Sequence, residues 1–119
     1  MCWDGSRLAA RALRDARPLL AQADSVVAIS IDGAESAPPG ASPDQLAKHL
    51  ARVRLPVKLI DVPASRSDIG PSIPSLAADE NLDMLVMGAY GHSQLREGFL
   101  GGVTRQMLQT MTIPTLTSH

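Results

Sequence analysis

The sequence contains few aromatic residues and only one cysteine. Aromatics make up 3% of the 119 residues and are Trp3, Tyr90 and Phe99. Platforms for single-stranded nucleic acid need exposed rings on which bases stack, so this class of protein is not expected. The single cysteine, Cys2, has no partner for a disulfide within the chain. That usage is typical of proteins in a reducing compartment.

The sequence also lacks an excess of charge of either sign and any long apolar run. A formal net charge of −1 gives no reason to expect general binding to polyanions. No apolar stretch approaches the roughly 20 residues of a membrane span, and the first residues do not resemble a secretory signal. We therefore expect a cytoplasmic protein that binds neither nucleic acid nor membrane. Arginines do recur at near-helical spacing, which favours a solvated helix face, at Arg7, Arg11, Arg14 and Arg17.

The chain nevertheless has enough apolar residues, 45%, to form an aliphatic core. We expect one domain over residues 1–119. Helical spacing and β-branched runs alternate along it. Helices are predicted at 6–20, 42–53, 68–81 and 102–111, and strands at 24–32, 56–62, 82–87 and 112–119. This alternation predicts an α/β fold, an open doubly wound parallel sheet with helices on both faces.

The prolines and the short segment before the first helix refine the predicted bounds and positions of these elements. Pro71 and Pro74 predict that the helix within 68–81 begins late or is kinked. Pro114 cannot donate a ladder hydrogen bond, which predicts an edge position for the last strand. Only Met1–Trp3 precede the first helix, whereas a usual strand has about 5–6 residues. We therefore expect a truncated first strand. Upstream residues absent from this chain, a sheet that tolerates a short central strand, or an upstream sister domain in a tandem protein would each account for it.

A glycine-rich stretch separates the strand at 82–87 from the last helix. Five of the nine glycines lie between Gly88 and Gly102, within MGAYGHSQLREGFLGGVTRQ. Glycines at the carboxyl end of a strand let the main chain approach a ligand, and the following helix N-terminus attracts anions. The stretch predicts either a phosphate-binding loop or simply tight turns. It matches neither the G-x-x-x-x-G-K-[ST] loop nor the dinucleotide fingerprint G-x-G-x-x-G.

The spacing Gly88-x2-Gly91-x9-Gly101, followed by a helix and a short strand with a proline, resembles the signature of the universal stress protein family. The turn Asp4-Gly5-Ser6 also resembles that family's first strand-to-helix turn. The resemblance extends from about Trp3 to His119. It implies an adenine-nucleotide-binding domain, with a five-stranded parallel sheet in the order 3-2-1-4-5, that forms homodimers.

The resemblance also assigns roles to individual residues. Asp4 would face the adenosine, although it can equally be a helix N-cap. The end of the second strand, at Ile29 and Ser30, would line the base pocket. The remaining positions would lie near the ribose and the phosphates: Met87, Gly88, Gly91, His92, Gly101, Gly102, Val103 and Thr104.

One residue departs from the family signature. Gly102 stands where the signature has Ser or Thr, so one hydroxyl donor is missing. A neutral hydrogen bond contributes about 0.5–1.5 kcal/mol net, and we expect weaker binding of ATP or another adenine nucleotide, with or without Mg²⁺, rather than none. The backbone amide of Gly102 and the hydroxyl of Thr104 remain as donors.

Three functions follow from these observations. The first is a nucleotide-binding module in stress response with at most slow hydrolysis, because no general base or carboxylate pair is positioned near the loop. The second is a dimeric interaction protein that has lost the nucleotide and pairs through residues 112–119. The third, an enzyme using Ser93 or His92, is disfavoured because Ser93 is outside any G-x-S-x-G elbow. The histidines and Cys2 show no metal-ligand spacing.

Overall fold

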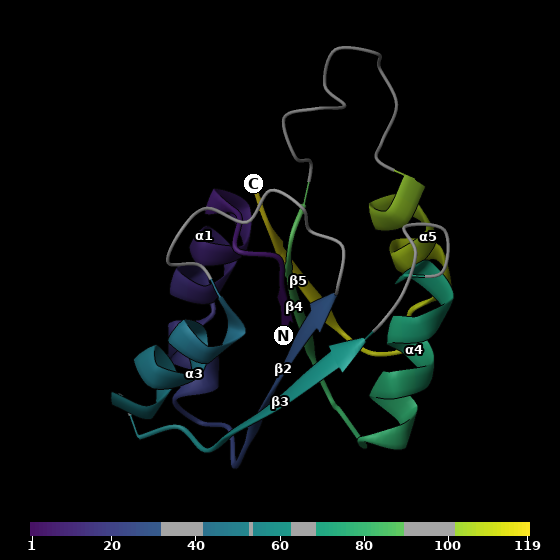
Figure 1. Cartoon of the computed structure of the whole chain (residues 1–119). Helices are drawn as coiled ribbons and strands as arrows, with labels where there is room; N and C mark the ends of the chain where they lie inside the picture. The colour runs from purple at the N-terminus through teal and green to yellow at the C-terminus, as the bar shows by residue number, and fades with distance from the viewer. Residues whose placement is uncertain (32–41, 53, 63–68, 90–101) are drawn as a thin grey trace.

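The computed structural model describes residues 1–31, 42–52, 54–62, 69–89 and 102–119 (Figure 1). Helices and strands alternate along these residues, as the sequence predicts. Their order is β1 (Cys2–Trp3), α1 (Arg7–Asp15), α2 (Arg17–Leu20), β2 (Val26–Ile31), α3 (Pro43–Arg52), β3 (Val57–Val62), α4 (Ile69–Asp79), β4 (Leu85–Gly88), α5 (Gly102–Thr110) and β5 (Thr115–Ser118).

All strand pairs in the described residues are parallel. β1, β2 and β3 form one hydrogen-bonded ladder, in which Cys2 lies opposite Ile29. β4 and β5 form a second ladder, with Leu85 opposite Thr115. β1 lies against β4, so the two ladders are neighbours, with the strands β3-β2-β1 in one and β4-β5 in the other. Among the described residues, no hydrogen-bonded ladder joins β1 to β4. The short first strand that the sequence predicts is present, with only two residues.

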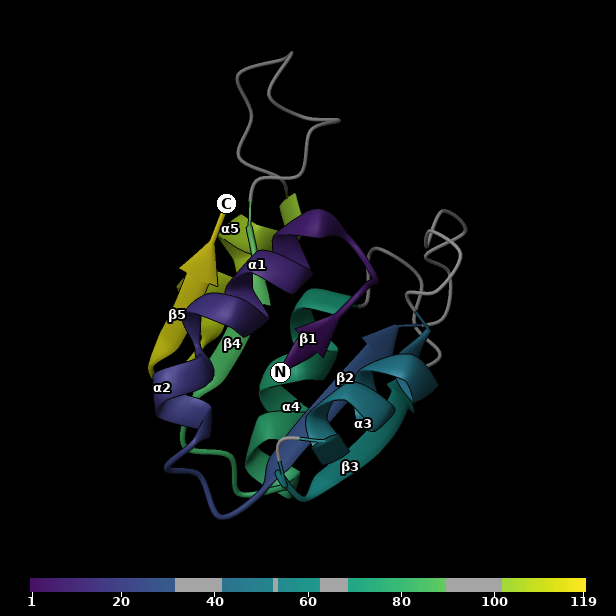
Figure 2. The same cartoon turned by 90° about the vertical axis from the view of Figure 1, so that its left-hand side faces the viewer.

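Helices cover both faces of these strands, which confirms the predicted open α/β architecture (Figure 1). α1 packs on β4 and β5, and α3 packs on β2 and β3. α4 and α5 pack against each other on the opposite face. Figure 2 shows β1 between α1 and α3, the two helices that flank it on one face.

The core has one apolar cluster on each face. Side chains of β4 alternate between them, because successive residues of a strand point to opposite faces. Val86 belongs to the cluster under α1 and α3, which also contains Met1, Ala12, Leu13, Ala16, Leu20, Val26, Ala28, Leu46 and Leu50. Leu85 and Met87 belong to the cluster under α4 and α5, with Ile73 and Met107.

The prolines have the positions that backbone chemistry allows. α4 begins at Ile69, so of the two predicted alternatives the late start is wrong, and the kink stays a prediction. Pro71 lies in its first turn, where backbone N–H groups have no intrahelical partner, while Pro74 lies inside the helix. β5 pairs only with β4 among the described strands, which confirms its edge position. The carbonyl oxygen of Pro114, just before β5, accepts a hydrogen bond from the Leu85 amide at 2.9 Å.

Among the helices in the described part of the chain, none has the length and apolarity needed to cross a bilayer.

Candidate functional site

The turn after β1 presents Asp4 to solvent. Gly5 has a φ of 71°, which glycine adopts without the strain that a side chain would cause. Ser6 is the N-cap of α1, because its hydroxyl accepts a hydrogen bond from the Ala9 amide at 3.1 Å. One carboxylate oxygen of Asp4 accepts a hydrogen bond from the Ser6 amide at 2.9 Å. Asp4 therefore shapes the turn, and the cap itself is Ser6.

Gly88, the last residue of β4, lies against the first turn of α1. A Cβ built on Gly88 would lie 2.8 Å from the Ala9 nitrogen and 2.8 Å from the Leu8 carbonyl carbon. Real Cβ atoms do not approach backbone atoms so closely. The absence of a side chain therefore lets the start of α1 rest on the end of β4, next to the turn that carries Asp4.

The neighbouring residues of these strands differ in exposure. The Ile29 side chain, in β2, is completely buried and is not exposed at this edge. Ser30, opposite Trp3 in the ladder, is half-buried. The Met87 side chain is also buried, in the cluster under α4 and α5.

The glycine signature is only partly within the described residues. Gly91, His92 and Gly101 lie outside them, as do Ser93 and Arg96. Gly102 is the first residue of α5, and Val103 and Thr104 belong to its first turn. α5 is anchored by Met107, which is buried, whereas Leu108 is 46% exposed. Of the positions predicted to contact the phosphates, the structure therefore describes only Gly102, Val103 and Thr104.

The described residues provide no strongly activated nucleophile at this edge. Cys2 lies in β1, and burial raises the pKa of its thiol to about 11. A thiol with such a pKa stays protonated and unreactive at neutral pH. No group of three His, Cys, Asp or Glu side chains able to hold a metal ion occurs in the part of the chain that the structure describes.

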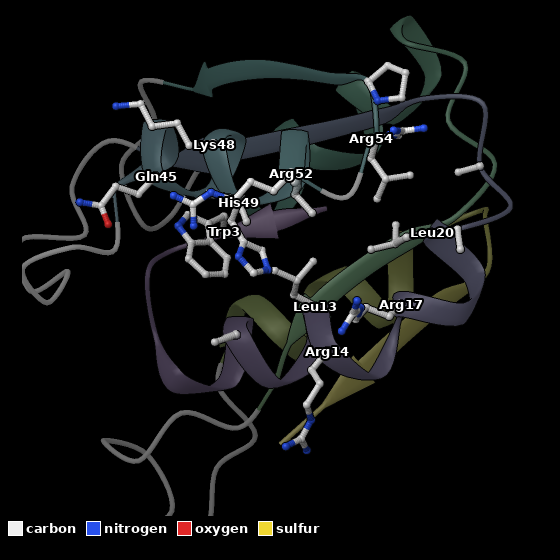
Figure 3. Close-up of a pocket in the computed structure, with 17 residues that line it drawn as sticks. Trp3, Leu13, Arg14, Arg17, Leu20, Gln45, Lys48, His49, Arg52 and Arg54 are labelled. Atoms are coloured by element: carbon white, nitrogen blue, oxygen red, sulfur yellow. The ribbon is translucent and has the colours of Figure 1, made fainter.

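A second feature, which sequence reasoning missed, is a groove between α1–α2 and α3 (Figure 3). Its volume is about 1020 Å³. We call it the basic groove, because its lining includes Arg14, Arg17, Lys48, Arg52 and Arg54 and, among the described residues, no Asp or Glu. The sequence does indicate part of this groove, because Lys48 and Arg52 are four residues apart in α3 and therefore share a helix face.

The parallel sheet covered on both faces defines an α/β domain of the doubly wound class, in which ligands bind at the carboxyl ends of the strands. The family model described as "Universal stress protein family" matches residues 1–119. The chain therefore belongs to the universal stress protein family.

Individual relatives resemble the chain to different extents. Universal stress protein Slr1230 of Synechocystis is 46% identical over 39 residues, which are 33% of this chain and 14% of that protein's length. A solved structure of hypothetical protein MJ0577, studied to assign its biochemical function, has a TM-score of 0.77 at 24% identity and covers 98% of this chain and 91% of its own. A universal stress protein from Archaeoglobus fulgidus has a TM-score of 0.68 at 14% identity, with coverages of 96% and 91%. These two structures support the fold.

Proposed function

We propose that this chain is an adenine-nucleotide-binding module of the universal stress protein family, acting in stress response without efficient catalysis. The observation that carries the proposal is the close packing of Gly88 on α1, which puts the carboxyl end of β4 beside the Asp4 turn. In open α/β sheets this edge is where ligands bind. We assign the function to the cytoplasm, where the single cysteine would stay reduced.

The described groups suit the two ends of a nucleotide. Asp4 is exposed and has carboxylate lone pairs beyond its one bond to the Ser6 amide, which suit ribose hydroxyls or an adenine amino group. The first amides of α5, from Gly102, have no partner four residues back in the helix and suit phosphate oxygens. Gly88 would form the floor between these two groups, above the buried side chains of Met87 and Ile29. Gly91, His92, Gly101, Val103 and Thr104 would complete the phosphate contacts.

The missing hydroxyl at Gly102 provides a sharp test. Gly102→Ser restores the side chain of the family signature and one hydrogen-bond donor. If phosphates bind at the start of α5, the variant should bind ATP about 2- to 12-fold more tightly, the equivalent of about 0.5–1.5 kcal/mol. Asp4→Asn should weaken binding, while the control Asp24→Asn, in the turn before β2, should not change it.

Thermal unfolding with nucleotide measures these differences. Ligand at about a hundred times its dissociation constant should stabilise the fold by roughly 2.7 kcal/mol. The titration is made with ATP, AMP and cyclic AMP, each with and without Mg²⁺. If neither the native chain nor Gly102→Ser responds to millimolar nucleotide while both are folded, the proposal is wrong.

A second function, dimerisation without nucleotide, is favoured by one observation. β5 has a free outer edge in the described sheet, and a free edge can pair with the same strand of a second copy. An interaction protein of the same family would use this edge whether or not it binds ATP. Sedimentation of a variant of β5 separates the two functions.

A further inference from the structure

The basic groove collects positive charge that carboxylates in the described part of the chain largely leave unpaired. Five of the chain's 11 Lys and Arg residues line the groove. The groove is therefore positive in a chain whose net charge is −1. Within the described residues, Arg14 pairs with Asp15 at 3.4 Å, and no other cation of the groove has a carboxylate partner. Lys48 and Arg52, four residues apart on α3, repel each other. Such an arrangement favours an anionic partner.

Arg54 adds to this charge from an unusual backbone conformation. Its φ is 58°, in the left-handed region where glycine is the usual residue. Arg54 lies in the turn that follows the end of α3 at Arg52. In this turn the Leu55 amide donates to the Leu50 carbonyl oxygen at 3.3 Å. Glycine would relieve the backbone strain there but would remove a cation from the groove. Residues held in this region against their preference cluster at binding sites.

The floor of the groove is apolar. Leu13 and Leu20 line it from one side and Leu46 and Leu50 from the other, all with largely buried side chains. Trp3 of β1 lies between the two helices, as Figure 3 shows. A ligand that fits this floor needs an apolar face as well as negative charge.

The groove is large enough to hold a segment of a peptide. Pockets for small molecules usually have volumes of about 300–1,000 Å³, and the basic groove, at about 1020 Å³, lies at the upper limit. It runs between two helices on the face where β1 has only two residues. Amphipathic helices bind such grooves through apolar residues three and four positions apart.

We propose that the basic groove binds an acidic amphipathic helix of a partner protein. The apolar face of that helix packs on Trp3 and Leu55, which line the groove and are only partly buried. Its Asp and Glu side chains pair with the cations of α1–α2 and α3. The site is separate from the strand ends proposed for the nucleotide, and either proposal can fail without the other.

The test uses Trp3, the only tryptophan of the chain, as a fluorescent reporter. The probe is a synthetic helix of about 18 residues with Leu on one face and Glu on the other. Binding should shift the emission of Trp3 saturably, and raising the salt concentration from about 0.05 M to about 0.5 M should weaken it. The same peptide with Lys in place of Glu should not bind.

Variants locate the site on the folded protein. Arg17→Glu combined with Arg52→Glu should weaken binding on the order of tenfold, because two attractions become repulsions at exposed positions. Arg54→Gly should weaken it while leaving thermal stability unchanged or higher. The control Arg7→Glu reverses one charge on α1 outside the groove and should leave binding unchanged.

Several results would overturn the proposal. One is an acidic peptide that leaves Trp3 emission unchanged, and another is equal binding by the Lys peptide. A third is unchanged affinity in the double variant. Binding of phosphatidylglycerol vesicles without binding of the acidic peptide would assign the groove to an anionic lipid surface instead.

Discussion

Gly88 of β4 and Ala9 of α1 lie so close that a Cβ on Gly88 would be 2.8 Å from the Ala9 nitrogen. This contact joins the last third of the chain to its first helix. The first glycine of the family signature is therefore required by helix packing, whether or not a ligand is bound. A glycine that looks like a ligand contact in the sequence has a structural role as well.

Gly88→Ala is expected to destabilise the fold. The added methyl group meets backbone atoms of Leu8 and Ala9, which cannot rotate away, and overpacking of this kind costs about 1–3 kcal/mol. Urea unfolding measures the change. Gly70→Ala is the matched control, because its Cβ would meet only the flexible side chain of Gln106, and alanine is favoured in a helix. Equal stability of Gly88→Ala and the native chain would contradict the packing role.

The hydrogen bond between Ser118 and Asp15 predicts a pH effect. The Ser118 hydroxyl donates to Asp15 at 2.7 Å, and this bond, with Arg14 and Arg11 nearby, lowers the pKa of the Asp15 carboxyl. A pKa lowered on folding contributes stability above the unfolded pKa, and the contribution is lost as the pH falls through the folded value. Ser118→Ala should move the pKa of Asp15 up toward its ordinary value.

Carbon-13 NMR of the Asp15 carboxyl during an acid titration measures this pKa. Ser75→Ala is the control, because the Ser75 hydroxyl donates only to the Pro71 carbonyl oxygen within α4. An identical Asp15 titration in Ser118→Ala and in the native chain would show that the bond does not form in solution.

Thr117→Pro tests pairing through β5. The carbonyl oxygens of Pro114 and Ser118 accept hydrogen bonds from β4, so alternation directs the Thr117 amide to the free edge. Proline removes that donor but leaves the ladder to β4 in place. If two copies pair through this edge, sedimentation should change from dimer to monomer without loss of helix content. An unchanged dimer would assign the interface to another surface.

The sequence predicts the helices and strands well where the apolar periodicity is strong. It predicts the boundary of an element less well where the end of the preceding helix determines it. β4 begins at Leu85 instead of Leu82, because the Leu82 amide donates to the Ala77 carbonyl oxygen at 2.8 Å and belongs to the end of α4. Asn81, with a φ of 51°, makes that turn. Asparagine tolerates this region, but nothing in the local pattern fixes where the strand starts.

The candidate site is predictable only in part for a different reason. Motif spacing identifies Asp4, Gly88 and the start of α5, but it does not show that the Ile29 side chain is completely buried. The basic groove needs two helices brought together by packing. Arg14 and Arg17 considered alone are a solvated helix face, and their grouping with Lys48 and Arg52 exists only in three dimensions.

An amide NMR titration with ATP tests the central proposal most directly. Nitrogen-15 labelled protein should show saturable shifts confined to one edge, at Asp4, at Gly88 and in the first turn of α5, with Lys48 and Arg52 unaffected. Larger shifts in Gly102→Ser at the same ATP concentration would support phosphate binding at that turn. Shifts confined to the basic groove, or none at millimolar ATP, would contradict a nucleotide site at the ends of the strands.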